Sequence, residues 1–157
     1  MKKYHRIIFV GKSGSIREPM AMGIFNDFNL NCQFEVLARG LVVLFPEPIN
    51  QKAEAVLISN GITLGEFTSV QLSREDITDG TLVLVMESAV RRKVLEQFED
   101  IDPEDVQVLT EYVGDELEII DPYGGTLQVY GLCYETLRKS IKKLVAMLDE
   151  GGGNGTE

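Results

Sequence analysis

The stretch IIFVGKSGSIREPMA, residues 7–21, decides the fold that the sequence predicts. Its first four residues, 7–10, form a continuous apolar run, which is typical of a strand buried on both faces of a parallel sheet. A turn of small residues follows, and Pro19 suits the first turn of a helix. Apolar residues then recur every fourth position from Met20 to Phe28, which marks one face of that helix. The stretch therefore predicts a strand, a small-residue loop and a helix in succession.

The alternation of strands and helices continues along the chain. Three further apolar runs predict strands at 34–38, 82–86 and 106–109. Helical patterns predict helices at 50–60, 90–98 and 127–148, and a capped helical turn at 73–76. The last helix carries the strongest periodicity, with apolar residues three and four apart from Leu127 to Leu148, and core packing explains that stripe.

This order of elements predicts an α/β fold. Strands that alternate with helices form a parallel sheet, here a four-stranded one in a three-layer arrangement with helices on both faces. A length of 157 residues suits one domain, which we expect over residues 1–149. The glycine-rich polar residues 150–157 predict a disordered tail.

Charge and hydropathy exclude several classes of partner. The net charge of −10 argues against nucleic acids and anionic membrane surfaces, because both attract basic proteins. No apolar run approaches the length that crosses a bilayer. The basic start is followed only by the apolar run 7–10, which is too short for a signal-peptide core. We therefore expect a cytoplasmic protein.

The cysteine and histidine content argues against a metal site. Cys32 and Cys133 stand far apart with no CxxC spacing, and His5 is the single histidine. Both cysteines are expected to be small buried hydrophobic residues. The sequence predicts neither a metal nor a cofactor.

The loop after the first strand is the candidate ligand site. In open α/β sheets, ligands bind at the carboxyl ends of the strands. Small residues let backbone amides converge, the following helix points its N-terminus at the same spot, and Arg17 can offer a fork of donors to a phosphate. The candidate anion-binding residues are Lys12, Ser13, Gly14, Ser15, Ile16 and Arg17. An ordinary strand-to-helix turn without a ligand fits the same residues equally well, whereas a Walker A loop would need glycine where Arg6 stands.

Three segments resemble one known family. The signature V-C-x-G-N-x-C-R-S-P-M-A of low-molecular-weight protein tyrosine phosphatases is matched at Val10, Arg17, Pro19, Met20 and Ala21. Residues 82–87, followed by Arg91 and Arg92, resemble the family's third strand and next helix. Residues 120–125 resemble the D-P-[FY]-G-G loop that carries the general acid, and 127–130 continue the likeness to bacterial members. The resemblance implies a phosphatase-like fold and a phosphate-binding loop.

The signature loop also departs from this pattern. Gly11 stands at the position of the nucleophilic cysteine, and Ile16 at that of the second cysteine. Ser13 and Gly14 replace the family's glycine and asparagine, and Gly14 can adopt the left-handed conformation of that asparagine without strain. Glu18 replaces the serine that helps to stabilise the thiolate. Beside the loop, its carboxylate would repel a phosphate or occupy the phosphate's donors.

The departures predict a homologue without catalytic activity. Attack on phosphorus needs a nucleophile, and Gly11 has no side chain to supply one. Asp121, at the general-acid position, then has no reaction to assist, and Tyr123 is expected at the rim of the pocket. We expect a binding or regulatory protein that holds phosphate or a phosphorylated ligand, with a protein as a further partner.

Two alternatives stay open from the sequence. An active phosphatase could use Ser13, Ser15 or a water oriented by Asp121 as its nucleophile, although no base for either serine is identifiable. A pure interaction domain would bind no anion at its loop.

Overall fold

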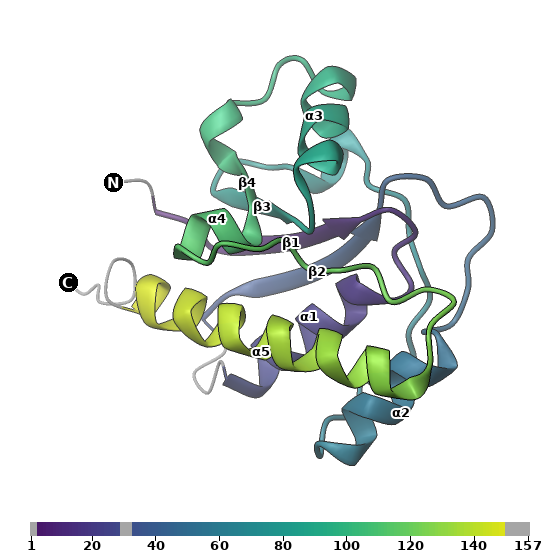
Figure 1. Ribbon diagram of the computed structural model, residues 1–157. Helices are drawn as coiled ribbons and strands as arrows, with labels where there is room; N and C mark the ends of the chain where they lie inside the picture. Colours follow the sequence, from purple (N-terminus) through teal and green to yellow (C-terminus); the bar gives the residue numbers. More distant parts are fainter. Residues whose placement is uncertain (1–2, 29–32, 150–157) are drawn as a thin grey trace.

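The computed structural model describes residues 3–28 and 33–149 (Figure 1). The sheet is parallel throughout, with the order β2-β1-β3-β4. Its strands are β1 Arg6–Gly11, β2 Glu35–Gly40, β3 Thr81–Val85 and β4 Val106–Val108. The predicted four-stranded parallel sheet is thereby confirmed. The tail predicted at 150–157, and Cys32, lie outside the described residues.

The two central strands are buried on both faces. All five residues of β3 and the stretch from Ile7 to Gly11 in β1 are buried. Such strands need apolar side chains at every position rather than at alternate ones. This explains why both strands were recognisable as continuous apolar runs.

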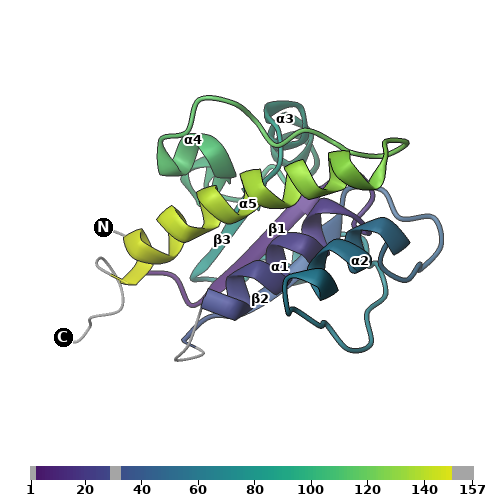
Figure 2. The ribbon, with the colours of Figure 1, turned by 60° about the horizontal axis from the view of Figure 1, so that its bottom comes forward.

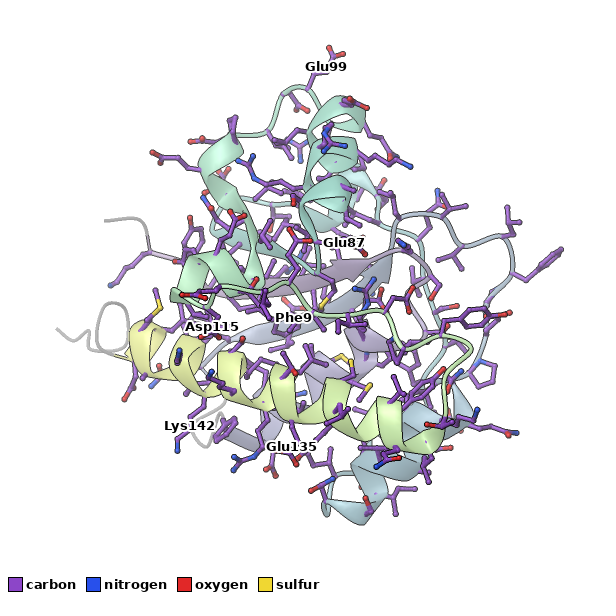
Figure 3. All side chains as sticks on the ribbon, viewed as in Figure 1. Phe9, Glu87, Glu99, Asp115, Glu135 and Lys142 are labelled. Carbon is purple, nitrogen blue, oxygen red and sulfur yellow. The ribbon has the colours of Figure 1, made fainter. Side chains whose placement is uncertain are left out.

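Helices cover both faces of the sheet (Figures 1 and 2). The helices are α1 Arg17–Phe28, α2 Gln51–Ser59, α3 Ser88–Gln97, α4 Leu109–Val113 and α5 Leu127–Leu148. One core cluster joins α1, α2, α4 and α5 to the sheet face that carries Phe9, which lies between β1 and α5 in Figure 3. The other cluster joins α3 to the opposite face, which carries Ile8 and Val10.

Two predictions about individual residues were wrong. Leu109, expected at the end of the fourth strand, is instead the first residue of α4. Its side chain is buried, as it would also be in a strand. A short apolar run cannot by itself distinguish a strand end from a helix start. Leu127, expected in the buried stripe of α5, is 52% exposed because it is the first residue of that helix, before the stripe meets the core at Tyr130.

The start of α2 is fixed next to the loop after β1. Asn50 caps this helix as predicted, since its side-chain oxygen accepts hydrogen bonds from the N–H groups of Lys52 and Ala53. The backbone N–H of Asn50 also donates to the Ser15 carbonyl at 2.9 Å. The cap therefore connects α2 to the candidate anion-binding loop.

The order of the strands places a crevice at the carboxyl end of β1. The chain pairs β1 with β2 on one side and with β3 on the other, and the helices that follow β1 and β3 lie on opposite faces. At such a switch point the loops after the two strands diverge and leave room for a ligand. Within 3–28 and 33–149, no helix is long and apolar enough to span a membrane.

Candidate functional site

The backbone of the loop after β1 turns its amides inward. The carbonyl oxygens of Gly11, Lys12 and Ser15 accept hydrogen bonds from the segment 41–50, at 2.8, 3.2 and 2.9 Å. A trans peptide points its C=O and N–H in opposite directions. The N–H groups of residues 12, 13 and 16 therefore face away from that segment, and that of Ile16 donates to the Glu18 carboxyl group inside the loop. Converging N–H groups at a helix N-terminus form a concave site for negative charge.

Two glycines let the loop adopt this shape. Gly14 has φ +82°, the left-handed conformation that the sequence predicts for it. Gly40, at the end of β2, lies against the loop so closely that a Cβ there would stand 2.6 Å from the Ser13 carbonyl carbon. The loop is thus packed directly on the neighbouring strand.

The carboxyl group of Glu18 occupies the inside of the loop. Glu18 is only 1% exposed, and its Oε1 accepts a hydrogen bond from the Ile16 N–H at 3.3 Å. A Cβ on Gly11 would stand 2.8 Å from the Glu18 carboxyl carbon and closer still to Oε2. The carboxyl group therefore fills the space that a side chain at position 11 would need.

Burial raises the pKa of Glu18 above its ordinary value. Loss of solvation disfavours the charged form, and this outweighs the opposing effects of the backbone N–H groups and of Arg17. Glu18 is therefore more readily protonated than an exposed glutamate.

The two basic side chains of the loop are paired with Glu87. Arg17 is 2% exposed, and its guanidinium donates to Glu87 Oε1 and to the Ile119 carbonyl, both at 2.8 Å. Lys12 Nζ lies 3.9 Å from Glu87 Oε2. Figure 3 shows Glu87 at the start of α3, beyond the end of β3. Glu87 was not predicted as a site residue, although it stands just beyond β3, a strand paired with β1.

A pocket of about 540 Å³ lies over the loop. The segment 47–51 forms one wall, and Asp121 and Tyr123 form another. From the loop itself, Lys12, Ser13, Ser15 and Ile16 line the pocket, whereas Gly14 and Arg17 do not. Sequence reasoning missed the contribution of Glu47, Asn50 and Gln51 to this pocket, because nothing in their spacing marks them.

Asp121 and Tyr123 form an exposed corner of the pocket. The Tyr123 N–H donates to Asp121 Oδ1 at 3.1 Å, and the Tyr123 side chain is 77% exposed. Lys52 Nζ donates to the Gly125 carbonyl at 2.8 Å and so connects α2 to this loop. Asp121 and Tyr123 therefore line the exposed side of the pocket.

Ser13, Ser15 and Cys133 could act as nucleophiles, but the contacts described for them include no base that would activate them. Ser13 Oγ and Ser15 Oγ lie 3.3 Å apart. His5 Nε2 lies 2.8 Å from the Asp79 carbonyl, at the start of β1 and hence about 20 Å from the loop at ~3.3 Å per strand residue. Cys133, on α5, is buried as predicted, and burial raises the pKa of its thiol to about 12. Among the described residues, no cluster of three or more His, Cys, Asp or Glu side chains could hold a metal.

Comparison with known proteins places this geometry in a family. The sequence model of the family described as low molecular weight phosphotyrosine protein phosphatase matches residues 6–153. The chain is 28% identical over 144 residues to a protein-arginine-phosphatase of Geobacillus stearothermophilus, covering 92% of this chain and 96% of that one. It is 31% identical over 139 residues to the low molecular weight protein-tyrosine-phosphatase PtpB of Staphylococcus aureus, covering 88% and 96%.

Solved structures agree with these matches. The YwlE arginine phosphatase from Geobacillus stearothermophilus superposes with a TM-score of 0.88 at 28% identity, covering 98% of both chains. The low molecular weight protein tyrosine phosphatase from T. tengcongensis superposes with a TM-score of 0.86 at 32% identity, covering 91% of this chain and 99% of that one. The chain thus belongs to the low molecular weight phosphotyrosine protein phosphatase family.

Proposed function

We propose that this chain is a family member without phosphatase activity, which binds phosphate or a phosphorylated ligand and has a regulatory role. One observation carries the proposal. Gly11, at the nucleophile's position in the signature, leaves a space that the Glu18 carboxyl group fills. The side chain that would attack phosphorus is absent, and a second departure from the signature occupies its place.

The chemistry of the family requires more than a binding loop. A thiolate at the helix N-terminus attacks phosphorus and carries the phosphoryl group as an intermediate, while an acid protonates the leaving group. Glycine cannot form that intermediate. Asp121 stands at the acid's position but has no displacement to assist, so its retention supports a binding surface rather than catalysis.

The serines of the loop do not favour an alternative nucleophile. Ser13 and Ser15 face each other at 3.3 Å, and the single histidine lies at the far end of β1. A serine hydroxyl is a weak nucleophile at neutral pH and is normally activated by a nearby base. We therefore place both serines in the wall of the binding pocket.

The ligand class follows from the loop and from the relatives. The inward amides, the helix N-terminus and the pocket of about 540 Å³ suit a phosphoryl group on a side chain that enters between the 47–51 wall and Tyr123. The curated relatives are named as protein-arginine and protein-tyrosine phosphatases. We propose a phosphorylated protein side chain as the ligand, encountered in the cytoplasm.

A turnover assay tests the absence of activity. Purified protein is incubated with p-nitrophenyl phosphate, a phosphotyrosine peptide and phosphoarginine, and the release of phosphate or nitrophenol is measured. We expect no turnover above buffer, because glycine at position 11 supplies no nucleophile. The T. tengcongensis tyrosine phosphatase and the Geobacillus stearothermophilus arginine phosphatase, assayed alongside, show that the tyrosine and arginine substrates and the conditions are adequate.

Variants purified in the same way separate the outcomes. Turnover that persists in Arg17→Ala, in protein shown to be folded by circular dichroism, indicates a contaminating phosphatase. Turnover that is lost in Arg17→Ala and in Asp121→Asn would refute the proposal and establish an active enzyme. Turnover that is lost in Arg17→Ala and in Glu18→Gln, but kept in Asp121→Asn, would point to the Glu18 carboxylate as the nucleophile, which also refutes the proposal.

A further inference from the structure

The Glu18 carboxyl group lies at the place in the loop where we propose that an anion binds. It is buried, it accepts the Ile16 N–H at 3.3 Å, and it stands on the inner side of Gly11. An incoming phosphate would need the same inward N–H groups. The loop is thus not an open receptor in this conformation, because a side chain of the protein itself occupies part of it.

The charges around Glu18 do not permit two anions together. Arg17 is the cation that acts on Glu18, but its guanidinium is already paired with Glu87. Lys12 also lies beside Glu87. Two negative charges in contact repel each other, and this repulsion is stronger in a buried site than in water. An ionised Glu18 would therefore strongly disfavour phosphate in the loop.

A protonated Glu18 removes this conflict. The neutral acid carries no charge to repel phosphate, and its O–H can donate a hydrogen bond to a phosphate oxygen. The step is a simple protonation, in which solvent supplies the proton and no covalent bond to the ligand forms. Burial raises the pKa of Glu18, so the neutral acid persists at a higher pH than it would on an exposed glutamate.

We propose that the loop takes up one proton with each phosphoryl group it binds, and that the proton resides on Glu18. This inference rests on the proposed function, because it concerns the regulation of the same loop. Ionised Glu18 acts as an internal competitor, so a fall in pH opens the site and a rise in pH closes it.

The other groups packed around Glu18 have separate roles. Arg17 on α1 and Cys133 on α5 interact with Glu18 directly. Glu87 and Lys12 act through the ion pairs that they form with Arg17 and with each other. Asp121 acts on Cys133. Arg17 and Glu87 form an ion pair, and Cys133 stays protonated because its pKa is raised to about 12. Asp121 is exposed to solvent. Glu18 is the group whose protonation changes the charge inside the loop.

Sulfate binding measured by calorimetry tests the inference, because sulfate stays a dianion across the range while phosphate itself titrates. Wild type, Glu18→Gln and the control Glu99→Gln are titrated between about pH 5 and about pH 8, in buffers of different ionisation enthalpy. Glu99 is exposed just after α3 and does not line the pocket. Above the pKa of Glu18, we expect wild-type affinity to fall about tenfold per pH unit with uptake of one proton. Glu99→Gln keeps this dependence.

The Glu18→Gln variant decides the case, since its side chain has the shape of the neutral acid. We expect it to bind sulfate with an affinity independent of pH and equal to that of wild type at the acid end. Binding by wild type that does not vary with pH, or a pH dependence retained in Glu18→Gln, overturns this inference alone. Failure of wild type, Glu18→Gln and Glu18→Ser to bind sulfate at any pH overturns the proposed phosphate binding as well.

Discussion

Gly11→Ala is the smallest change that tests how Glu18 is packed. The added Cβ would stand 2.8 Å from the Glu18 carboxyl carbon and closer to Oε2, so the carboxyl group must leave its position. Overpacking of this kind costs about 1–3 kcal/mol, and the lost hydrogen bond from the Ile16 N–H adds about 1 kcal/mol. Replacing glycine reduces the entropy of the unfolded chain, which offsets about 0.4–1 kcal/mol. We expect a net loss of about 1–3 kcal/mol in the free energy of unfolding.

A double-mutant cycle isolates the contact. In a Glu18→Ser background the carboxyl group is gone, so Gly11→Ala should cost less than about 0.5 kcal/mol, and the coupling energy should be about 1–2.5 kcal/mol. Urea unfolding followed by circular dichroism measures each free energy, since the chain has no tryptophan. Equal costs of Gly11→Ala in both backgrounds would refute the packing of Glu18 against Gly11.

Three further outcomes follow from the site. Gly11→Cys alone should restore little phosphatase activity, because the Glu18 carboxyl group fills the space of the new side chain; robust turnover of p-nitrophenyl phosphate would contradict this. Arg17→Ala should lower the free energy of unfolding by about 2–4 kcal/mol, because it removes a buried guanidinium together with its bonds to Glu87 and the Ile119 carbonyl; a loss below about 0.5 kcal/mol in urea would argue against these contacts. The folded protein binds the Glu18 proton more tightly than the unfolded chain, so stability should fall as pH rises from 4.5 through the raised pKa, by at most ~1.4 kcal/mol per pH unit. The same fall seen in Glu18→Gln would assign it to another group.

Much of the fold was predictable because local patterns and packing agree. The strands β1 and β3 are buried on both faces, so residues 7–10 and 82–85 are apolar at every position and are recognisable without knowledge of the sheet. The helix cap at Asn50 and the left-handed Gly14 were predictable from side-chain chemistry alone. The short α4 was not, because five residues beginning at Leu109 carry no helical period.

The candidate site was predictable only in part. The loop after β1 could be found from the sequence because the fold class places ligands at the carboxyl ends of strands, and Asp121 because residues 120–125 resemble a family motif. The pairing of Arg17 with Glu87 depends on contact between residues 70 positions apart. The position of the Glu18 carboxyl group depends on which rotamer the packed interior leaves open. No local sequence pattern predicts either feature. Both determine which charges and N–H groups of the loop are already paired within the protein.

A high-resolution crystal structure grown in sulfate at about pH 8 tests the central claim most directly, since an ionised carboxylate and a dianion compete for the same donors there. We predict that Glu18 Oε1 remains within hydrogen-bonding distance of the Ile16 N–H and that no sulfate lies inside the loop. A sulfate on the amides of residues 12–17, clasped by Arg17 with the Glu18 side chain turned out of the loop, would contradict it.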